Sequence, residues 1–128
     1  MIVAIGTDLV RIERIATTIQ RFGSCFLKRI FTEQEIAFCS ARVGTVASAC
    51  YAKRFAAKEA IAKALGWGMS GGIWFRDIEI LPDNYGKPVV QVMAATAARL
   101  RALQVDRIHL SLTDEEGLAS AVVILEQL

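Results

Sequence analysis

The sequence predicts an α+β protein in which helices pack on a mainly antiparallel sheet. Apolar residues recur at helical spacing through most of the first half of the chain, whereas β-branched runs bounded by turn residues dominate the second half. Helices and strands segregated in this way favour α+β over a doubly wound parallel sheet, in which the two alternate. The 128 residues are 54% hydrophobic, which suits one compact domain with a real core. We therefore expect residues 1–128 to form a single domain.

The first predicted elements are a buried strand and an amphipathic helix. Residues 2–6 form a short apolar, β-branched run that is typical of a strand. Asp8 follows this run, where it can either cap a helix or hold a metal ion at the strand end, and capping is the more frequent role. Gly23 is the predicted stop of the helix. The apolar stripe of this helix consists of Ile12, Ile15, Ile19 and Phe22.

Two more helices are predicted before the middle of the chain. Thr32 and Glu35 have the spacing of a capping box, so a second helix is expected to begin there. A third and stronger helix covers residues 47–65 and ends at Gly66. The loop after it is predicted to be flexible because of Gly68, Gly71 and Gly72.

The second half is predicted to contain a hairpin, one helix and two further strands. These elements are strands at residues 73–81 and 88–93 joined by a turn at 82–87, an alanine-rich helix at 94–103, and strands at 108–113 and 118–125. Apolar and polar side chains alternate through residues 108–113, as in a strand with one buried face.

The net charge of +2 is unevenly distributed along the chain. Residues 1–66 hold 10 Lys and Arg against 5 Asp and Glu, whereas residues 67–128 hold 5 against 8. This asymmetry predicts an anionic partner for the first half. It is too mild for a dedicated nucleic-acid binder, which would also place exposed aromatic residues among the basic ones. Because core packing explains Phe22 and Phe55, we expect no nucleic-acid partner.

Cysteine usage and hydropathy predict a cytoplasmic location. Cys25, Cys39 and Cys50 have neither CxxC nor metal-ligand spacing, so we expect three reduced thiols. The first residues lack the basic stretch of a secretory signal, and no apolar run approaches the length that spans a bilayer. We therefore expect no membrane partner.

The most informative segment is the sequence RFAAKEAIAKALG at residues 54–66. Glu59 and Lys63 are four residues apart and share a helix face whose other side chains are small. Such a pair is either a plain surface ion pair, worth about 0.2–0.5 kcal/mol, or part of a site that a ligand can approach closely. The spacing alone favours the surface pair. Arg54 and Lys58 project from another side of the helix.

Several stretches resemble the holo-[acyl-carrier-protein] synthase family. GTDLVRIERI at residues 6–15 and RFAAKEAIAKALG at residues 54–66 are similar to its two signature stretches. Shorter matches are F-T-x-x-E at 31–35, G-K-P at 86–88 and H-L-S-L at 109–112. Because these matches run in order across nearly the whole chain, the resemblance implies a 4'-phosphopantetheinyl transferase-like fold.

The resemblance also implies an activity and a metal site. Members of the family transfer 4'-phosphopantetheine from coenzyme A to a serine of apo-acyl carrier protein and release adenosine 3',5'-bisphosphate, a step in fatty acid biosynthesis. Asp8 and Glu59 are the implied ligands of Mg²⁺, which takes oxygen ligands and leaves room for substrate phosphates. Lys63 is implied to contact the same phosphates, so Glu59 and Lys63 are the expected catalytic residues. Which group accepts the serine proton stays open, and Glu59 is a candidate, directly or through water.

Further residues of the matched stretches are expected to contact coenzyme A. Arg54 and Lys58 either meet its 3'-phosphate end or form a solvated basic face. Lys63 is the third expected ligand of coenzyme A, and His109 is either the fourth or a structural histidine. Asp114 stands where many members of the family have a histidine, so no role of that histidine transfers to this chain.

The first long helix is expected to dock the protein partner. Arg11, Arg14 and Arg21 form a stripe opposite the isoleucine stripe. With Thr18 they occupy four positions of this stripe, none of which is acidic, and this suits an acidic partner helix. The resemblance implies that this partner is acyl carrier protein. It also implies a homotrimer with active sites between subunits. The alternative activity is that of a small Mg²⁺-dependent nucleotide pyrophosphohydrolase, which would use the same acidic site with water as the nucleophile.

Overall fold

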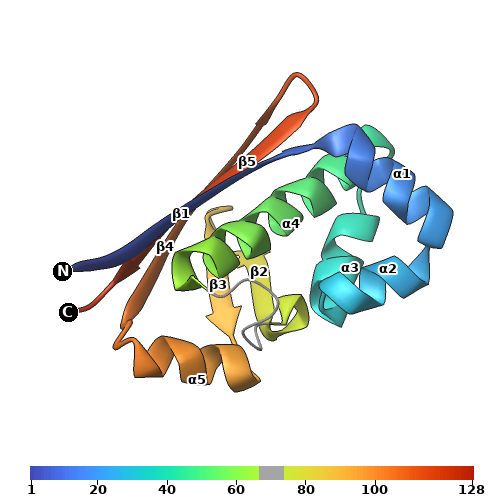
Figure 1. Cartoon of the computed structure of the whole chain (residues 1–128). Helices are drawn as coiled ribbons and strands as arrows, with labels where there is room; N and C mark the ends of the chain where they lie inside the picture. Colours follow the sequence, from blue (N-terminus) through green and yellow to red (C-terminus); the bar gives the residue numbers. More distant parts are fainter. Residues whose placement is uncertain (67–73) are drawn as a thin grey trace.

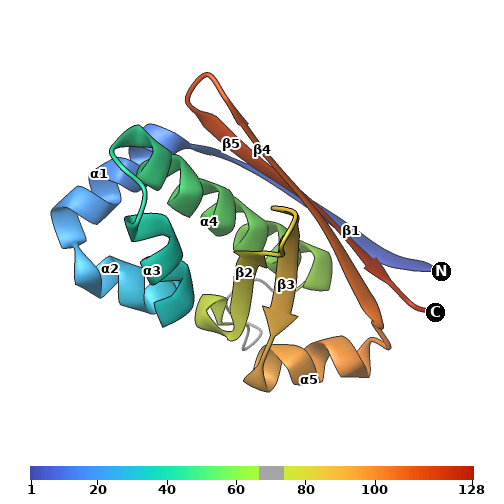
Figure 2. The same cartoon turned by 180° about the vertical axis from the view of Figure 1, so that it is seen from behind.

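The fold is that of a long central helix lying across an antiparallel sheet, with shorter helices at both ends (Figures 1 and 2). The computed structural model describes residues 1–66 and 74–128, so the predicted glycine-rich loop lies outside the described residues. In chain order the elements are β1 (Ile2–Arg11), α1 (Ile12–Phe22), α2 (Ser24–Ile30), α3 (Glu33–Ser40), α4 (Thr45–Leu65), a short 3₁₀ helix (Phe75–Asp77), β2 (Ile78–Pro82), β3 (Pro88–Val92), α5 (Ala94–Ala102), β4 (Arg107–Glu115) and β5 (Leu118–Glu126). The predicted fold class is confirmed.

The strands form two antiparallel units. β1, β5 and β4 make a three-stranded sheet in that order, and β2 pairs with β3 in a separate hairpin. Side chains alternate between the two faces of a strand. Gly6 and Asp8 therefore face α4, whereas Ile5 and Leu9 point to the outer face of the sheet. His109 lies on this outer face too, because it and Ile5 both pair with the same residue of β5, Ile124.

β1 is longer than predicted, and this changes the position of Asp8. The strand does not stop at Gly6 because β5 offers backbone partners along its whole length, down to the pairing of Arg11 with Leu118. Asp8 lies inside the strand, and the residue at the N-cap of α1 is Arg11, whose side chain makes no capping bond. The prediction that Asp8 caps a helix is therefore wrong.

Most of the other predicted boundaries are close to the observed ones. Thr32 and Glu35 form the predicted capping box of α3. Gly66 ends α4 in the left-handed conformation, with φ 81°, which glycine adopts without steric cost. The strand predicted at residues 73–81 is shorter, because a 3₁₀ turn precedes β2 and the strand begins at Ile78. The helix α2 had no predicted counterpart.

The core lies between α4 and the three-stranded sheet. Ala52, Ala56 and Ala60 are all 0% exposed, and α4 contacts both β1 and β5 along this alanine face. Small side chains allow a strand backbone to approach a helix backbone closely. The closest approach is at Gly6, where an added Cβ would lie only 2.0 Å from the carbonyl oxygen of Ala60. No helix within the described ranges combines the length and the hydropathy needed to cross a bilayer.

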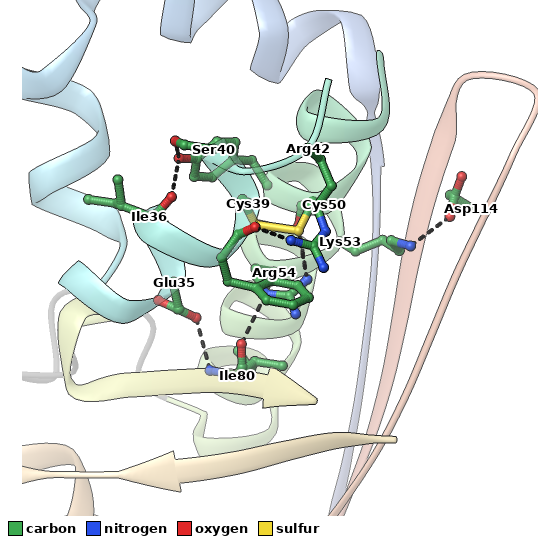
Figure 3. Close-up of a disulfide and its surroundings, with 12 residues drawn as sticks. Glu35, Ile36, Cys39, Ser40, Arg42, Cys50, Lys53, Arg54, Ile80 and Asp114 are labelled. Atoms are coloured by element: carbon green, nitrogen blue, oxygen red, sulfur yellow. Dashed lines mark hydrogen bonds and ion pairs between the residues drawn. A yellow bond between two sulfur atoms is a disulfide. The ribbon is translucent and has the colours of Figure 1, made fainter. Parts of the chain in front are cut away.

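Two of the three cysteines are not free thiols. Cys39 of α3 and Cys50 of α4 are joined by a disulfide, whereas Cys25 is free and exposed (Figure 3). The expectation of three reduced thiols is wrong, because the packing of α3 against α4 brings together two cysteines whose spacing in the sequence carries no disulfide signal.

The close contact at Gly6 predicts a large effect of a single methyl group. In G6A the new Cβ would overlap a backbone oxygen that is held in the helix, so β1 and α4 must move apart. We expect a loss of about 1–3 kcal/mol or more in the free energy of unfolding, measured by urea denaturation. A4G, which adds no atoms to the same strand, is the control for general effects on β1. Wild-type stability of G6A would contradict this packing.

Candidate active site

A lysine and two carboxylates meet where β1 crosses α4. The Nζ of Lys63 donates to Asp8 Oδ1 at 2.9 Å and to the Thr7 carbonyl oxygen at 3.2 Å. Asp8 reaches this point because it follows Gly6 by two residues on the same face of β1. The Asp8 side chain is only 14% exposed, whereas that of Lys63 is 57% exposed. Lys63 is thus an accessible cation tethered to a partly buried carboxylate, and the ion pair that it forms is with Asp8.

Glu59 belongs to the same cluster, because the charges of Asp8 and Lys63 act on its carboxyl. Partial burial raises the pKa of the Glu59 carboxyl, and the negative charge of Asp8 raises it further. The positive charges of Lys63 and Arg14 act in the opposite direction. The structure thus brings Asp8, Glu59 and Lys63 together, while their roles in metal binding and catalysis stay predictions.

A cleft of about 850 Å³ opens on the side of α4 that faces the α3–α4 loop. Its walls come from α1, α3, the first half of α4, the hairpin β2–β3 and the tip of the hairpin β4–β5. The charged residues that line it are Glu13, Arg42, Lys53, Arg54 and Asp114. Three cations against two carboxylates make this cleft suitable for a phosphate-bearing ligand.

Two guanidinium groups share one aromatic ring in the wall of this cleft. The Arg42 guanidinium carbon lies 3.5 Å from the centroid of the Phe38 ring, and that of Arg54 lies 4.8 Å from it. Arg54 is 5% exposed and donates to the Ile80 carbonyl oxygen at 2.9 Å (Figure 3). Burial lowers the pKa of Arg54, and the charge of Arg42 lowers it further. The expectation that Arg54 lies on a solvated face is wrong.

A third cation of the cleft is paired across it. Lys53 Nζ lies 2.9 Å from Asp114 Oδ1, which ties α4 to the end of β4 (Figure 3). Sequence reasoning missed Lys53 and Arg42 as site residues. Lys53 directly precedes the matched stretch, which was the one available signal. Arg42 lies in the loop between α3 and α4, and nothing in the spacing connects it with Arg54.

Lys58 lies in the core. It is 0% exposed, and its ammonium donates to Glu35 Oε1 at 2.6 Å, to the Ile30 carbonyl oxygen at 2.8 Å and to the Phe75 carbonyl oxygen at 2.9 Å. Burial lowers the pKa of Lys58 to about 8, although the charge of Glu35 opposes this shift. Glu35 also accepts from the backbone of Ile80. Neither sequence interpretation of Lys58, as a coenzyme A ligand or as part of a solvated face, agrees with this burial, because all three hydrogens are used inside the protein.

His109 lies on the face of the sheet that points away from Asp8. Its Nε2 is 3.0 Å from Glu126 Oε1, and its side chain is 53% exposed. One chain therefore does not bring His109 to the cluster of Asp8, Glu59 and Lys63. A contact between His109 and the substrate of the same chain is not supported.

The predicted arginine stripe is exposed on the structure. Arg11, Arg14 and Arg21 are all exposed, and the opposite side of α1 buries Ile15. Arg14 lies near enough for its charge to act on Glu59. An apolar cleft of about 390 Å³, lined in part by Phe22, Phe26 and Trp74, adjoins the far end of α1. A cationic helix next to an apolar cleft is a surface that an acidic, amphipathic helix can cover.

The fold and the site together define an enzyme that acts on a phosphate-bearing substrate. Two carboxylates beside an accessible lysine are groups that can offset developing charge and accept a proton. The cation-lined cleft lies along the first half of α4 and is large enough to hold part of an anionic substrate.

Comparison with known proteins gives the family. Residues 4–122 match the sequence profile of the 4'-phosphopantetheinyl transferase superfamily. The chain is 49% identical to the holo-[acyl-carrier-protein] synthase of Magnetococcus marinus, over 98% of this chain and 94% of that protein. It is 46% identical to the synthase of the same name from Paramagnetospirillum magneticum, over 98% and 97%.

Solved structures agree with this assignment. The holo-[acyl-carrier-protein] synthase of Neisseria meningitidis superposes with a TM-score of 0.88 at 40% identity, covering 99% of this chain and 100% of that one. A holo-(acyl-carrier-protein) synthase of Bacillus anthracis in complex with CoA (3',5'-ADP) superposes with a TM-score of 0.83 at 34% identity, covering 99% and 98%. The chain belongs to the 4'-phosphopantetheinyl transferase superfamily and is a phosphopantetheinyl transferase of the holo-[acyl-carrier-protein] synthase type.

The buried pair of Lys58 and Glu35 leads to a testable prediction about stability. K58M leaves the Glu35 carboxylate buried without its counter-ion, so we expect the free energy of unfolding to fall by about 3–5 kcal/mol. The double variant E35Q/K58M removes both charges and should recover much of this loss. Urea denaturation followed by circular dichroism measures both effects. An equal loss in the single and the double variant would show that the charge pairing is not what matters.

Proposed function

We propose that this enzyme transfers 4'-phosphopantetheine from coenzyme A to a serine of apo-acyl carrier protein in a Mg²⁺-dependent reaction of fatty acid biosynthesis. The products are holo-acyl carrier protein and adenosine 3',5'-bisphosphate. The observation that carries the proposal is the meeting of Lys63 with Asp8, where both charges also act on Glu59. The names of the relatives and the coenzyme A complexes of the synthases from Bacillus anthracis and Helicobacter pylori support it.

Asp8 and Glu59 are the proposed Mg²⁺ ligands, and their chemistry fits this ion. Within residues 1–66 and 74–128 there is no cluster of three or more His, Cys, Asp or Glu that could hold a metal. Two carboxylates are nevertheless a common protein contribution to a Mg²⁺ site, because water and substrate phosphate complete the shell. The charge of Asp8 raises the pKa of Glu59, a repulsion that a divalent cation relieves. When bound, the ion would neutralise charge on the pyrophosphate of coenzyme A.

Lys63 and Glu59 have separate proposed roles in the reaction. The Lys63 ammonium, more than half exposed, can turn from Asp8 to the substrate phosphates and offset the charge of the departing bisphosphate. Glu59 is the proposed acceptor of the serine proton, directly or through one water. The attacking serine oxygen then forms the bond to phosphorus while the bond to the bisphosphate oxygen breaks.

The cation-lined cleft is the proposed place for the 3'-phosphate end of coenzyme A. Arg42 and Arg54 present two fixed guanidinium groups there, and such groups bind phosphate through paired hydrogen bonds. Arg54 keeps its predicted role as a coenzyme A ligand, and Arg42 and Lys53 join it. Lys58 does not belong to this set, because it is used in the core.

The outer face of the sheet supports the proposal of a homotrimer. Ile5 and Leu9 of β1 are 66% and 63% exposed, and Val122 of β5 is 41% exposed on the same face. Contiguous exposed apolar residues of this kind mark an interaction surface. We assign this face to contacts between subunits, which would allow His109 to serve a neighbouring subunit's site. The proposed location of the enzyme is the cytoplasm.

The role of Glu59 is tested by E59Q. This variant keeps the size of the side chain but removes the carboxylate, so we expect phosphopantetheine transfer to fall by about 100-fold or more with the fold intact. The assay weighs the carrier protein after incubation with coenzyme A and Mg²⁺, and E33Q, an exposed change on α3, is the control. Full activity of E59Q would remove its proposed role. Release of bisphosphate from coenzyme A without carrier protein would instead favour the pyrophosphohydrolase.

The docking surface is tested by R14E/R21E. Reversing two exposed charges on α1 should raise the KM for acyl carrier protein by about tenfold or more, because attraction to the acidic partner becomes repulsion. The affinity for coenzyme A should change far less. R101E, which reverses an exposed charge on α5 at the other end of the molecule, is the control (Figure 1). Unchanged carrier-protein kinetics in R14E/R21E would contradict docking on α1.

A further inference from the structure

A disulfide lies in the wall of the cation-lined cleft. It joins Cys39, at the end of α3, to Cys50 of α4, and both cysteines are buried. Cys50 lines the cleft, and Arg54 Nη1 lies 3.3 Å from both its Sγ and its carbonyl oxygen (Figure 3). The disulfide is therefore in direct contact with a residue that we assign to the phosphates of coenzyme A.

The segment that the disulfide closes carries the second guanidinium of the cleft. Arg42 lies between the two cysteines in the sequence, and its guanidinium donates to the Phe38 carbonyl oxygen and stacks on the Phe38 ring. Phe38 is adjacent to Cys39, and Arg54 is one helical turn beyond Cys50. The covalent bond thus ties the turn that holds Phe38 and Arg42 to the turn that holds Arg54.

The chemistry of the proposed compartment makes such a bond informative. Cytosolic disulfides are rare, because glutathione and thioredoxin keep thiols reduced, and those that form are usually catalytic or redox-sensing. Cys39 and Cys50 have no place in the catalytic cluster of Asp8, Glu59 and Lys63. A sensing role agrees with their position beside the substrate cleft.

We propose that Cys39 and Cys50 form a reversible thiol–disulfide switch that sets the affinity of the cleft for the phosphate-bearing end of coenzyme A. This inference rests on the proposed function, since it names a control of the same site. The oxidant is a low-molecular-weight disulfide of the glutathione type. The switch acts by fixing or releasing the wall in which Arg42 faces Arg54.

The exchange balances in two steps. A thiolate of Cys50, a residue that lines the cleft, attacks one sulfur of glutathione disulfide, and one glutathione thiolate leaves and takes up a proton. The Cys39 thiolate then attacks the Cys50 sulfur of the mixed disulfide and releases the second glutathione. Two electrons pass from the protein sulfurs to glutathione, and both protein protons end on the two glutathione thiols.

The oxidised form is the one expected to bind the nucleotide more tightly. In the reduced form the two sulfurs are no longer bonded and separate to van der Waals contact. The end of α3 is then held to α4 only by non-covalent contacts, such as the hydrogen bond between Ser40 and Tyr51, and has more freedom to move. Ligand binding must then order Arg42 as well, and ordering groups on binding costs affinity. By linkage, the nucleotide that favours the oxidised form must stabilise the disulfide by the same factor.

The experiment measures binding of adenosine 3',5'-bisphosphate to the full chain in glutathione buffers of different redox ratio. Titration calorimetry gives the Kd, and mass spectrometry of the alkylated protein gives the fraction with the Cys39–Cys50 bond. We expect the Kd to be about fivefold or more lower for the oxidised protein. At a fixed concentration of reduced glutathione, the concentration of glutathione disulfide needed for half oxidation should fall by the same factor when the nucleotide saturates the protein.

Two variants provide the controls. C39S/C50S should bind with the reduced-form Kd at every redox ratio, and C25S, which lacks only the exposed thiol, should switch like the wild-type chain. Circular dichroism checks that both are folded. Equal Kd values for the oxidised and reduced wild-type protein, or a pair of cysteines that glutathione disulfide never oxidises, would overturn the switch alone. Absence of binding in both forms would contradict the proposed coenzyme A site itself.

Discussion

The contact between Gly6 and the backbone of Ala60 is the constraint on which the rest of this structure depends. The backbones of a strand and a helix can touch only where no side chain separates them. This requires a glycine on the strand, here Gly6, and small residues on the helix. This contact fixes the separation of β1 and α4. Asp8 follows Gly6 on the same face, and Glu59 and Lys63 flank Ala60, so the geometry of the charged cluster is set by backbone packing.

Different faces of the helix α4 contribute to the core and to the charged cluster. Arg54 and Lys58 point to one side, where they bond to β2 and to Glu35, whereas Glu59 and Lys63 point toward β1. Lys58 and Glu35 connect α3, α4 and the backbone of β2 through fully buried charges. Losing one partner of such a pair costs far more than the pair contributes as a whole, so this connection holds α4 in one orientation.

Local signals predicted the elements well where they act within a few residues. The capping box of Thr32 and Glu35 and the glycine that ends α4 at Gly66 need only neighbouring backbone, and both were confirmed. Prediction failed where a distant element decides. β1 runs past Gly6 because β5 supplies partners for it, and Cys39 meets Cys50 because α3 packs on α4. A basic residue such as Lys58 is predicted to be exposed, because its acidic partner Glu35 lies 23 positions away and no local pattern connects the two.

The sequence by itself determined the fold class, the family and the residues of the charged cluster. Hydrophobic periodicity predicts the fold class, and two continuous motifs contain the family signature and the charged residues. Only the tertiary structure decided what each charged residue does. It placed Lys58 in the core, brought Arg42 next to Arg54, and put His109 on the opposite face of the sheet from Asp8. The physical reason is that the burial and pairing of a charge depend on elements brought together by packing, which no short-range pattern records.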